Sequence, residues 1–327
     1  EAQDGRFEIK IKGDEIELRT SILPGNYAET VVLRILNPKS IGVPLEELGL
    51  EEKLRLRIEK EIARPNGMIL TTGPTGSGKT TTLYAFLRKV NAPGSKIITI
   101  EDPIEYHLQG IVQTQVDKKN YTFALGLRSA LRQDPDIIMV GEIRDGEVAE
   151  TAINAALTGH LVFSTLHTND AAGSFPRLID LGVSEKVLSS AINVAMAQRL
   201  LRKLCATCKK QRAATPDEQK IIDRILAGVV DRGMVPQTTN MVWDASAEGC
   251  PNCGGRGYKG RIGIFEAIFM DRTIEEILRS KPSEREIAEA AKPQAIPTMP
   301  QDGVLKVLRG VTSLEELSRV VDLDEIK

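Results

Sequence analysis

Near the start of the chain, apolar and polar residues alternate, and this period of two predicts β-strands. Apolar side chains occupy every second position in residues 7–11, 16–18 and 31–35. The turn-forming residues 12–14 and 24–26 separate these three runs. We therefore expect three antiparallel strands in a small unit at the start of the chain.

This small unit covers residues 1–37, and we expect it to be the C-terminal part of a larger N-terminal domain. The first residue is Glu1 rather than Met, so we also expect residues upstream of it. Residues 38–45 contain Pro38, Gly42 and Pro44 and are predicted to be a linker.

After the linker, short apolar runs alternate with stretches of helical period. The predicted strands are 67–72, 96–100, 136–140 and 161–165, and the predicted helices are 45–62, 80–90, 123–131 and 148–157. Strands that alternate with helices are typical of a parallel sheet covered by helices. We expect an α/β core over residues 46–200.

The last third of the chain combines cysteine pairs with short helical patterns. Helices are predicted at 213–230, 273–278, 284–291, 304–308 and 313–320. We assign residues 201–258 to a cysteine-containing subdomain and residues 259–327 to a helical C-terminal subdomain.

Composition narrows the class of protein. The chain has 327 residues, which suggests about two domains. Hydrophobic residues make up 41% and charged residues 27%, as in ordinary globular proteins. The formal net charge of −2 and the 4% of aromatic residues give no support to direct nucleic-acid binding. No uncharged apolar run approaches the ~18 residues of a membrane span, and the first residues do not resemble a signal peptide.

Residues 73–80 read Gly-Pro-Thr-Gly-Ser-Gly-Lys-Thr and match the phosphate-binding pattern G-x-x-x-x-G-K-[ST]. They follow a predicted strand and open a predicted helix, which is the context that this motif requires and which argues against a merely flexible turn. Lys79 is expected to reach the β- and γ-phosphates, and the Thr80 hydroxyl to bind Mg²⁺. The candidate nucleotide ligands are Gly73, Pro74, Thr75, Gly76, Ser77, Gly78, Lys79, Thr80 and Thr81.

Acidic residues follow two of the predicted strands. Residues 134–142 form an apolar strand that ends in Glu142, and residues 97–100 are followed by Glu101 and Glu105. The carboxyl ends of parallel strands meet at the ligand crevice, so both acidic clusters should face the phosphate loop. For Glu101 and Glu105, the alternative of a solvated acid at a strand end stays open.

Cationic side chains and histidines add further candidates. Arg128, Arg132 and Arg144 flank the strand at 136–140, where they stabilise phosphate charge or form surface ion pairs. His160 and His167 bracket the strand at 161–165, and we expect them to sense or position the nucleotide. A zinc site between these histidines is not expected, because no third ligand lies nearby.

Four cysteines form two C-x-x-C pairs, Cys205 with Cys208 and Cys250 with Cys253. Each pair supplies two thiolates to one tetrahedral ion, and four ligands leave no open position for catalysis. The spacing therefore predicts a structural zinc site. An iron–sulfur site, a redox pair and a chance arrangement are the alternatives.

These motifs together closely resemble the type II secretion and type IV pilus assembly ATPases. The resemblance rests on residues 73–80, on residues 100–105 (the family's "Asp box"), on residues 127–145 (its Walker B region) and on residues 158–170 (its "His box"). With the four cysteines, the match extends over nearly the whole chain. The cysteines are typical of the assembly and secretion branch and absent from pilus-retraction ATPases, which favours assembly or export.

The resemblance implies a RecA-like P-loop ATPase core with a parallel sheet, preceded by a small mixed α/β N-terminal domain and followed by a zinc-binding insertion and a helical C-terminal region. It also implies a homohexamer that binds ATP and Mg²⁺ between the N-terminal domain and the core. By the same resemblance, Glu105 is the general base and Glu142 the Mg²⁺-linked acid. Arg19 and Arg34 close onto the γ-phosphate, while the three core arginines lie near the site or at the subunit interface.

The implied function is a motor that couples ATP hydrolysis to the assembly of pilin-like subunits. Its expected partners are a polytopic inner-membrane platform protein and a cytoplasmic or membrane adaptor. Its expected place is the cytoplasm, peripheral to the inner membrane at its cytoplasmic face. A retraction or DNA-transfer motor, or a nucleotide-gated scaffold with little hydrolysis, is the alternative.

Overall fold

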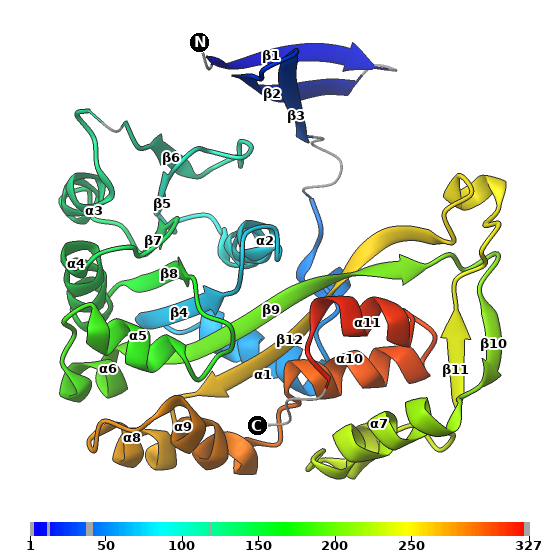
Figure 1. The fold of residues 1–327 in the computed structure, drawn as a ribbon. Helices are drawn as coiled ribbons and strands as arrows, with labels where there is room; N and C mark the ends of the chain where they lie inside the picture. The colour runs from blue at the N-terminus through cyan, green and yellow to red at the C-terminus, as the bar shows by residue number, and fades with distance from the viewer. Residues whose placement is uncertain (1–2, 12–13, 37–41, 118, 324–327) are drawn as a thin grey trace.

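A seven-stranded sheet forms the centre of the computed structural model, which describes residues 3–11, 14–36, 42–117 and 119–323 (Figure 1). The strand order is β12-β9-β4-β8-β7-β5-β6, and every pair is parallel except β12 with β9. The strands are β4 (Gly67–Thr72), β5 (Ile97–Glu101), β6 (Val112–Gln115), β7 (Ile137–Val140), β8 (Leu161–Leu166), β9 (Ile192–Leu204) and β12 (Tyr258–Phe269).

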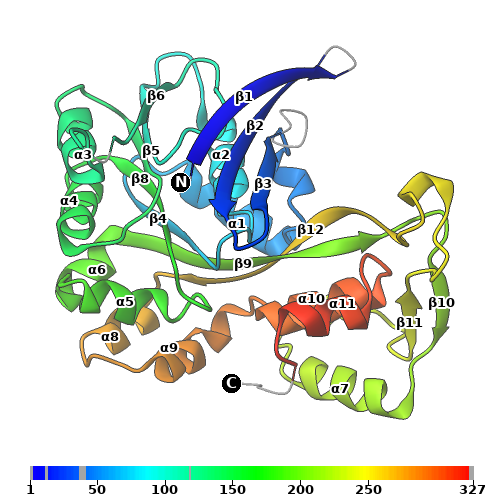
Figure 2. The same cartoon turned by 45° about the horizontal axis from the view of Figure 1, so that its top comes forward.

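Helices cover both faces of this sheet, because its central strands are apolar on both sides (Figure 2). Successive side chains of a strand point to opposite faces. Accordingly, Ile69 of β4 packs in one cluster with Leu83, while its neighbours Met68 and Leu70 pack in another with Leu127. The first cluster holds α1 (Glu52–Ile62) and α2 (Lys79–Val90), and the second holds α3 (Phe123–Leu131), α4 (Gly146–Leu157), α5 (Ser174–Asp180) and α6 (Glu185–Ala191).

A separate antiparallel sheet precedes the core and confirms the three predicted strands. It contains β1 (Gln3–Ile11), β2 (Asp14–Pro24) and β3 (Glu29–Leu36), in the order β1-β2-β3. Ile16 and Leu18 are buried on it. In the register of β2 and β3, Arg19 lies directly opposite Arg34, so both arginines belong to the same face of this sheet.

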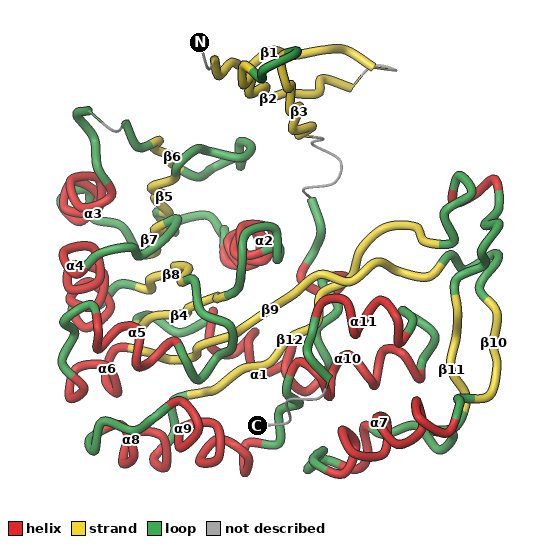
Figure 3. The backbone as a smooth tube through the Cα atoms, in the orientation of Figure 1, coloured by secondary structure: helices red, strands yellow, loops and turns green. Residues whose placement is uncertain are grey.

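In the C-terminal third, most elements lie around an extension of the two longest strands, whereas the helices of residues 272–291 lie near α6 at the other end of β12 (Figure 3). β9 and β12 continue past the core sheet to a two-stranded sheet of β10 (Lys210–Ala213) and β11 (Met241–Asp244). The helices here are α7 (Pro216–Ala227), α8 (Arg272–Leu278), α9 (Glu284–Ala291), α10 (Met299–Leu308) and α11 (Leu314–Val320). Within the described ranges, no helix is both long enough and apolar enough to cross a membrane.

The structure corrects the prediction of one helix over residues 45–62. A 3-10 turn (Leu45–Glu47) is followed by α1, which begins only at Glu52. Gly49 separates them with a φ of 97°, and a Cβ there would lie 2.6 Å from Ile262. The left-handed backbone and the close approach of β12 therefore end the first turn.

Strand β12 was also not expected, because residues 259–327 were predicted to be helical. The helical prediction holds from Arg272 onward, but residues 258–269 form an antiparallel edge of the core sheet. The strands β6 and β9 and the helices α5 and α6 were not predicted either. β12 pairs with β9 across more than sixty residues, as in the pair Gln198–Phe265, so no local pattern indicates this pairing.

Gly303 lets α10 approach α11 closely, and replacing it with alanine should destabilise the chain. A Cβ at this position would lie 2.3 Å from Cδ1 of Leu317, which is fully buried. Overpacking costs about 1–3 kcal/mol, which exceeds the ~0.5–1 kcal/mol that alanine gains over glycine inside a helix. We expect a lower urea midpoint for Gly303→Ala. Glu315→Ala, on the exposed face of α11, is the control that should leave the midpoint nearly unchanged.

Candidate nucleotide site and metal centre

The phosphate loop connects β4 to α2 at the carboxyl end of the parallel strands. Gly73, Gly76 and Gly78 have φ values of 145°, 81° and 93°, in the region that favours glycine. A Cβ on Gly73 would lie 2.6 Å from the carbonyl oxygen of Gln198, so no larger side chain fits there. The loop thus has the narrow backbone cradle that phosphate binding requires.

Lys79 begins α2 and folds back over the loop. Its Nζ donates to the carbonyl oxygens of Gly73 at 2.6 Å and Pro74 at 3.1 Å. Burial lowers the pKa of Lys79, while the charge of Glu142 raises it. A phosphate placed in the cradle would take over the role of these carbonyl acceptors, and a charge-assisted bond to phosphate is the stronger of the two.

Glu142 lies beside the loop, two residues after the end of β7, and its side chain is only 13% exposed. Its Oε1 lies 2.5 Å from Nη2 of Arg144, and its Oε2 lies 3.3 Å from Nε2 of His167. The predicted acid, one arginine and one histidine therefore meet at the carboxyl edge of the sheet.

The loop that follows β5 carries Glu105, and it contacts the N-terminal sheet. Arg19 donates from Nη2 to the carbonyl oxygen of Ile104 at 3.0 Å, and its Nη1 lies 3.8 Å from Oε2 of Glu105. The side chain of Glu105 is partly exposed. This contact places a cation of the N-terminal unit against the acidic loop of the core.

Glu101, in contrast, does not face the crevice. It is 3% exposed and accepts hydrogen bonds from Thr99, Tyr84 and Gln113. Burial raises the pKa of Glu101, and burial together with this carboxylate raises the pKa of Tyr84. Since both of its oxygens accept hydrogen bonds from buried or half-buried protein groups, Glu101 has a structural place in the core and not one beside a substrate. This is a correction to its place among the predicted catalytic residues.

Of the four other predicted residues, His160, Arg128 and Arg132 make contacts elsewhere, and Arg34 lies opposite Arg19 on the N-terminal sheet. His160 precedes β8, at the amino edge of the sheet and about 20 Å along the strand from His167, and its Nδ1 lies 3.1 Å from the carbonyl oxygen of Ala155. Arg128 pairs with Glu147 of α4, and the exposed Arg132 donates to Ser129. Arg34 is exposed on β3.

Several residues that brace the site were missed. Gln198 of β9 is buried and donates from Nε2 to the carbonyl oxygen of Ser77 at 2.7 Å. The Thr72 hydroxyl accepts from the backbone N–H of Thr168 at 2.8 Å and so joins the phosphate loop to the segment that holds His167. Arg199 donates to the carbonyl oxygens of Gln198 and Asn169. The polar Gln198-Arg199 pair inside an apolar run was the one sequence signal for this brace.

The residues present fit a magnesium–nucleotide complex. Thr80 lies in the first turn of α2, and the charge of Glu142 acts on Lys79, the residue before it. Within the described residues, Ser77 Oγ is buried without a hydrogen-bond partner. A hydroxyl and a carboxylate are the oxygen donors that Mg²⁺ prefers. Thr80 and Glu142 are thus the groups that would hold the ion, directly or through water.

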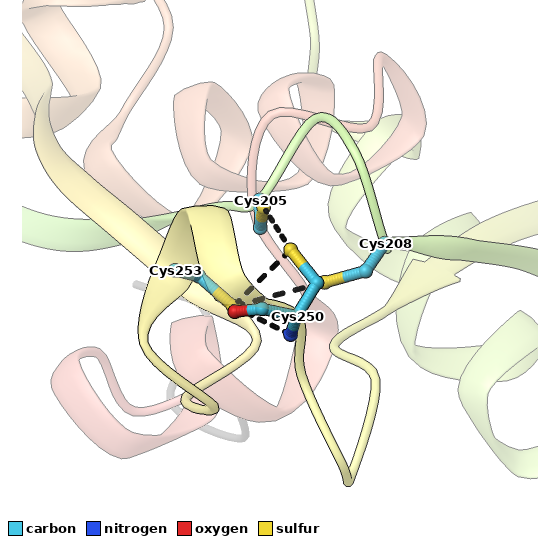
Figure 4. A group of neighbouring side chains, drawn as sticks. All are labelled: Cys205, Cys208, Cys250 and Cys253. Carbon is cyan, nitrogen blue, oxygen red and sulfur yellow. Dashed lines mark hydrogen bonds between the residues drawn. The ribbon is translucent and has the colours of Figure 1, made fainter.

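The four cysteines converge at the far end of β9 and β12 (Figure 4). Their sulfur atoms all lie within 4.8 Å of one another, with separations of 3.7 Å between Cys205 and Cys250 and 3.9 Å between Cys208 and Cys253. A tetrahedral ion with Zn–S bonds of ~2.3 Å would separate its sulfurs by about 3.8 Å. The donor set and its dimensions therefore fit one tetrahedral metal ion.

The backbone around the cysteines supports thiolates. Although burial of Cys253 opposes ionisation, the N–H groups of Cys250 and Gly257 donate to its sulfur and lower its pKa to about 6. Asn252 also donates to the sulfur of Cys205. Burial and the neighbouring thiols instead raise the pKa of Cys208 to about 12. The convergence of the four sulfur atoms, and not their pKa values, is therefore what favours a metal centre over inert buried thiols.

A phosphate loop on a mostly parallel sheet, with acidic residues at the ends of neighbouring strands, defines the class of P-loop ATPase-like α/β proteins. The chain belongs to the family of type II/IV secretion system proteins, whose family model matches residues 2–319.

Curated relatives agree with this membership. The chain is 46% identical to the type II secretion system protein E of Pseudomonas aeruginosa, over 97% of this chain and 61% of that protein. It is 42% identical to the type II secretion system ATPase E of Vibrio cholerae, over 97% of this chain and 61% of that protein. The chain thus spans about three fifths of the length of these relatives.

Solved structures show the same fold. The pilus retraction motor PilT with bound ADP is 28% identical, with a TM-score of 0.66, over 97% of this chain and 77% of that one. The Legionella pneumophila ATPase DotB gives a TM-score of 0.64 at 22% identity, over 98% of this chain and 77% of that one. These neighbours confirm the predicted RecA-like fold class, and the relatives confirm the predicted family.

Proposed function

We propose that this chain is the motor part of a hexameric ATPase that drives assembly of pilin-like subunits in type II secretion or type IV pilus biogenesis. The observation that carries the proposal is the contact of Arg19 with the Glu105 loop. A cation from one unit and an acid from the other meet in the loop that follows β5, at the same edge of the sheet as the phosphate loop that follows β4. Closure of the N-terminal sheet on the core therefore changes the charge around a bound nucleotide.

In this mechanism the chain's own side chains divide the work. Lys79 and the N–H groups of the phosphate loop bind the β- and γ-phosphates, and Thr80 and Glu142 hold Mg²⁺, which neutralises phosphate charge. Glu105 accepts a proton from the attacking water. Arg19, with Arg34 on the same face of the sheet, stabilises the charge that develops on the transferred phosphoryl group.

The remaining residues keep supporting roles in the proposal. His167 orients Glu142, and Arg144, which now pairs with Glu142, turns to a phosphate or to a neighbouring subunit. Arg128 and Arg132, both exposed on the side of α3, are offered as subunit-interface residues. His160 has no proposed role in chemistry, because it lies at the opposite edge of the sheet.

The proposal extends to the organisation and setting of the chain. The units are an N-terminal part (1–37), a linker (38–45), an ATPase core (46–200), a zinc subdomain (201–258) and a C-terminal subdomain (259–327). Zinc in residues 201–258 is the feature that favours assembly or export over retraction. The partners are a polytopic inner-membrane platform protein and an adaptor, and the motor works in the cytoplasm, peripheral to that membrane.

Steady-state ATP hydrolysis over a series of protein concentrations tests this function. Specific activity should rise with concentration, because each site needs a neighbouring subunit. Glu142→Gln should lower kcat at least ~10-fold, since it removes the charge that holds the metal. Glu150→Gln, an exposed change on α4, is the matched control. Stoichiometric ATP binding with no turnover would instead favour the nucleotide-gated scaffold.

A further inference from the structure

Gln113, on the edge strand β6, contacts the loop that carries Glu105 at two backbone positions. Its Oε1 accepts from the N–H of Leu108 at 2.7 Å, and its Nε2 donates to the carbonyl oxygen of Tyr106 at 3.1 Å. These contacts hold the part of the loop that follows Glu105 in the chain. A single side chain therefore fixes two peptide groups within three residues of the acid.

The amide of Gln113 is itself held by two buried residues of the core. Its Nε2 lies 3.1 Å from Oε1 of Glu101 and 3.4 Å from the hydroxyl of Tyr84. Glu101 and Tyr84 are 3% and 0% exposed, so neither partner has water to replace the amide. The buried carboxylate thus anchors the glutamine, and the glutamine anchors the loop.

Only a side chain with both a donor and an acceptor satisfies this arrangement. Glu101 and the Tyr106 carbonyl need a donor, whereas the Leu108 N–H needs an acceptor. Glutamine meets both needs, and glutamate at neutral pH meets only one. An unpaired buried acceptor carries a large desolvation penalty, so the loop would move to relieve it.

The same loop is held from two further directions. The backbone N–H of Ile104 donates to Oε1 of Gln115 at 3.3 Å, and the Ile104 carbonyl accepts from Arg19 at 3.0 Å. The Gln115 contact is longer and the residue more exposed. The Arg19 contact depends on the position of the N-terminal sheet. Gln113 belongs to the core and supplies its hydrogen bonds to the loop, alongside the packing of Tyr106 and Leu108 on the core.

We propose that Gln113 is a positioning residue for Glu105: it locks residues 104–108 so that the carboxylate points into the crevice. The inference rests on the proposed role of Glu105 as the general base. It assigns to Gln113, Glu101 and Tyr84 a joint function in holding the loop, although the buried Glu101 and Tyr84 lie away from the crevice. A displacement of about 1 Å in a catalytic group costs up to ~10²-fold in rate, so the effect on turnover should be large.

Gln113→Glu, which retains the side-chain size and the acceptor for Leu108, tests the proposal. We expect kcat to fall about 10- to 100-fold. KM for ATP and the affinity for a fluorescent ATP analogue should stay within about twofold, because the phosphate loop is untouched. Amide exchange of residues 104–108 should become faster. Gln109→Glu, the same substitution on an exposed position of the same loop, should change none of these values.

Two further variants separate a positioning role from a structural one. Glu101→Gln combined with Gln113→Glu restores a donor and an acceptor between the two side chains, so turnover should partly recover. Gln113→Leu removes the hydrogen bonds without adding a charge and should match Gln113→Glu in kcat. Retained ATP-analogue binding shows that each variant is folded.

A double-mutant comparison with Glu105→Gln decides whether Gln113 acts through Glu105. Glu105→Gln alone should lower kcat by about 10²–10⁴-fold, and Gln113→Glu should then add little. A full additional loss in the Glu105→Gln background, or unchanged loop exchange in Gln113→Glu, overturns the positioning role alone. Unchanged turnover in Glu105→Gln overturns the proposed base and the positioning role together.

Discussion

Lys79→Ala should abolish measurable ATP hydrolysis, the largest single effect expected on the chemistry. The lysine folds back over the phosphate loop, where it bonds to the carbonyl oxygens of Gly73 and Pro74. Its removal costs both a charge-assisted bond to phosphate in the bound state and the charge that stabilises the transition state. We expect ATP affinity to fall together with kcat, unlike the kcat-only loss predicted for Gln113→Glu.

The measurement is phosphate release at saturating ATP, with a fluorescent nucleotide to report binding separately. Lys186→Ala, at an exposed position of α6, serves as the control for loss of a lysine. Burial lowers the pKa of Lys79 but Glu142 raises it. Turnover of Lys79→Ala that stays within tenfold of the parent chain would remove the phosphate loop from the proposed mechanism.

The part of the site that the sequence predicts well is the part made by contiguous residues. A phosphate loop needs one strand, one turn and one helix, and residues 67–90 supply all three in order. The cysteine pairs are similar, because each C-x-x-C pair places two sulfurs in one turn of the chain. Local geometry determines these units, so they can be predicted without knowing how the rest of the chain is arranged.

The distinction between Glu101 and Glu105 is not readable from the sequence. Both faces of β5 are buried, so the period of two does not tell which way Glu101 points. Its direction depends on Tyr84, seventeen residues earlier on α2, which donates to it. Glu101, at the end of a buried strand, thus serves as an anchor, whereas Glu105, four residues further along the chain, stays partly exposed.

The sequence does contain a signal that His160 lies away from the ligand edge of the sheet. A residue that precedes a parallel strand lies at its amino end, whereas ligands bind beyond the carboxyl ends. His160 precedes β8 and His167 follows it, so the strand itself separates them. The brace from Gln198 is different, because it requires β9 to lie beside β4, and that pairing is a property of the whole sheet.

Removal of metal from the four cysteines should have the largest effect on folding. The segment from Cys205 to Cys253 leaves the core between β9 and β12, and the two C-x-x-C turns close it at its base. Structural zinc contributes about 10–16 kcal/mol of apparent binding free energy in small zinc-binding peptides. We therefore expect a strong chelator to release one zinc ion per chain and to unfold residues 201–258.

Metal content by elemental analysis and protease cleavage between β9 and β12 measure the two halves of this prediction. Cys253→Ser should reproduce the effect of the chelator, because it removes one of the four sulfur ligands, a buried one that receives two backbone N–H bonds. Ser246→Ala, in the same segment, is the control. A chain that contains no zinc, or a cysteine variant that resists protease like the parent, would leave the cysteines as a packed thiol cluster. Assignment to the assembly and export branch would then lose its main support. The phosphate loop would not be affected, because Gln198 braces it within the core sheet.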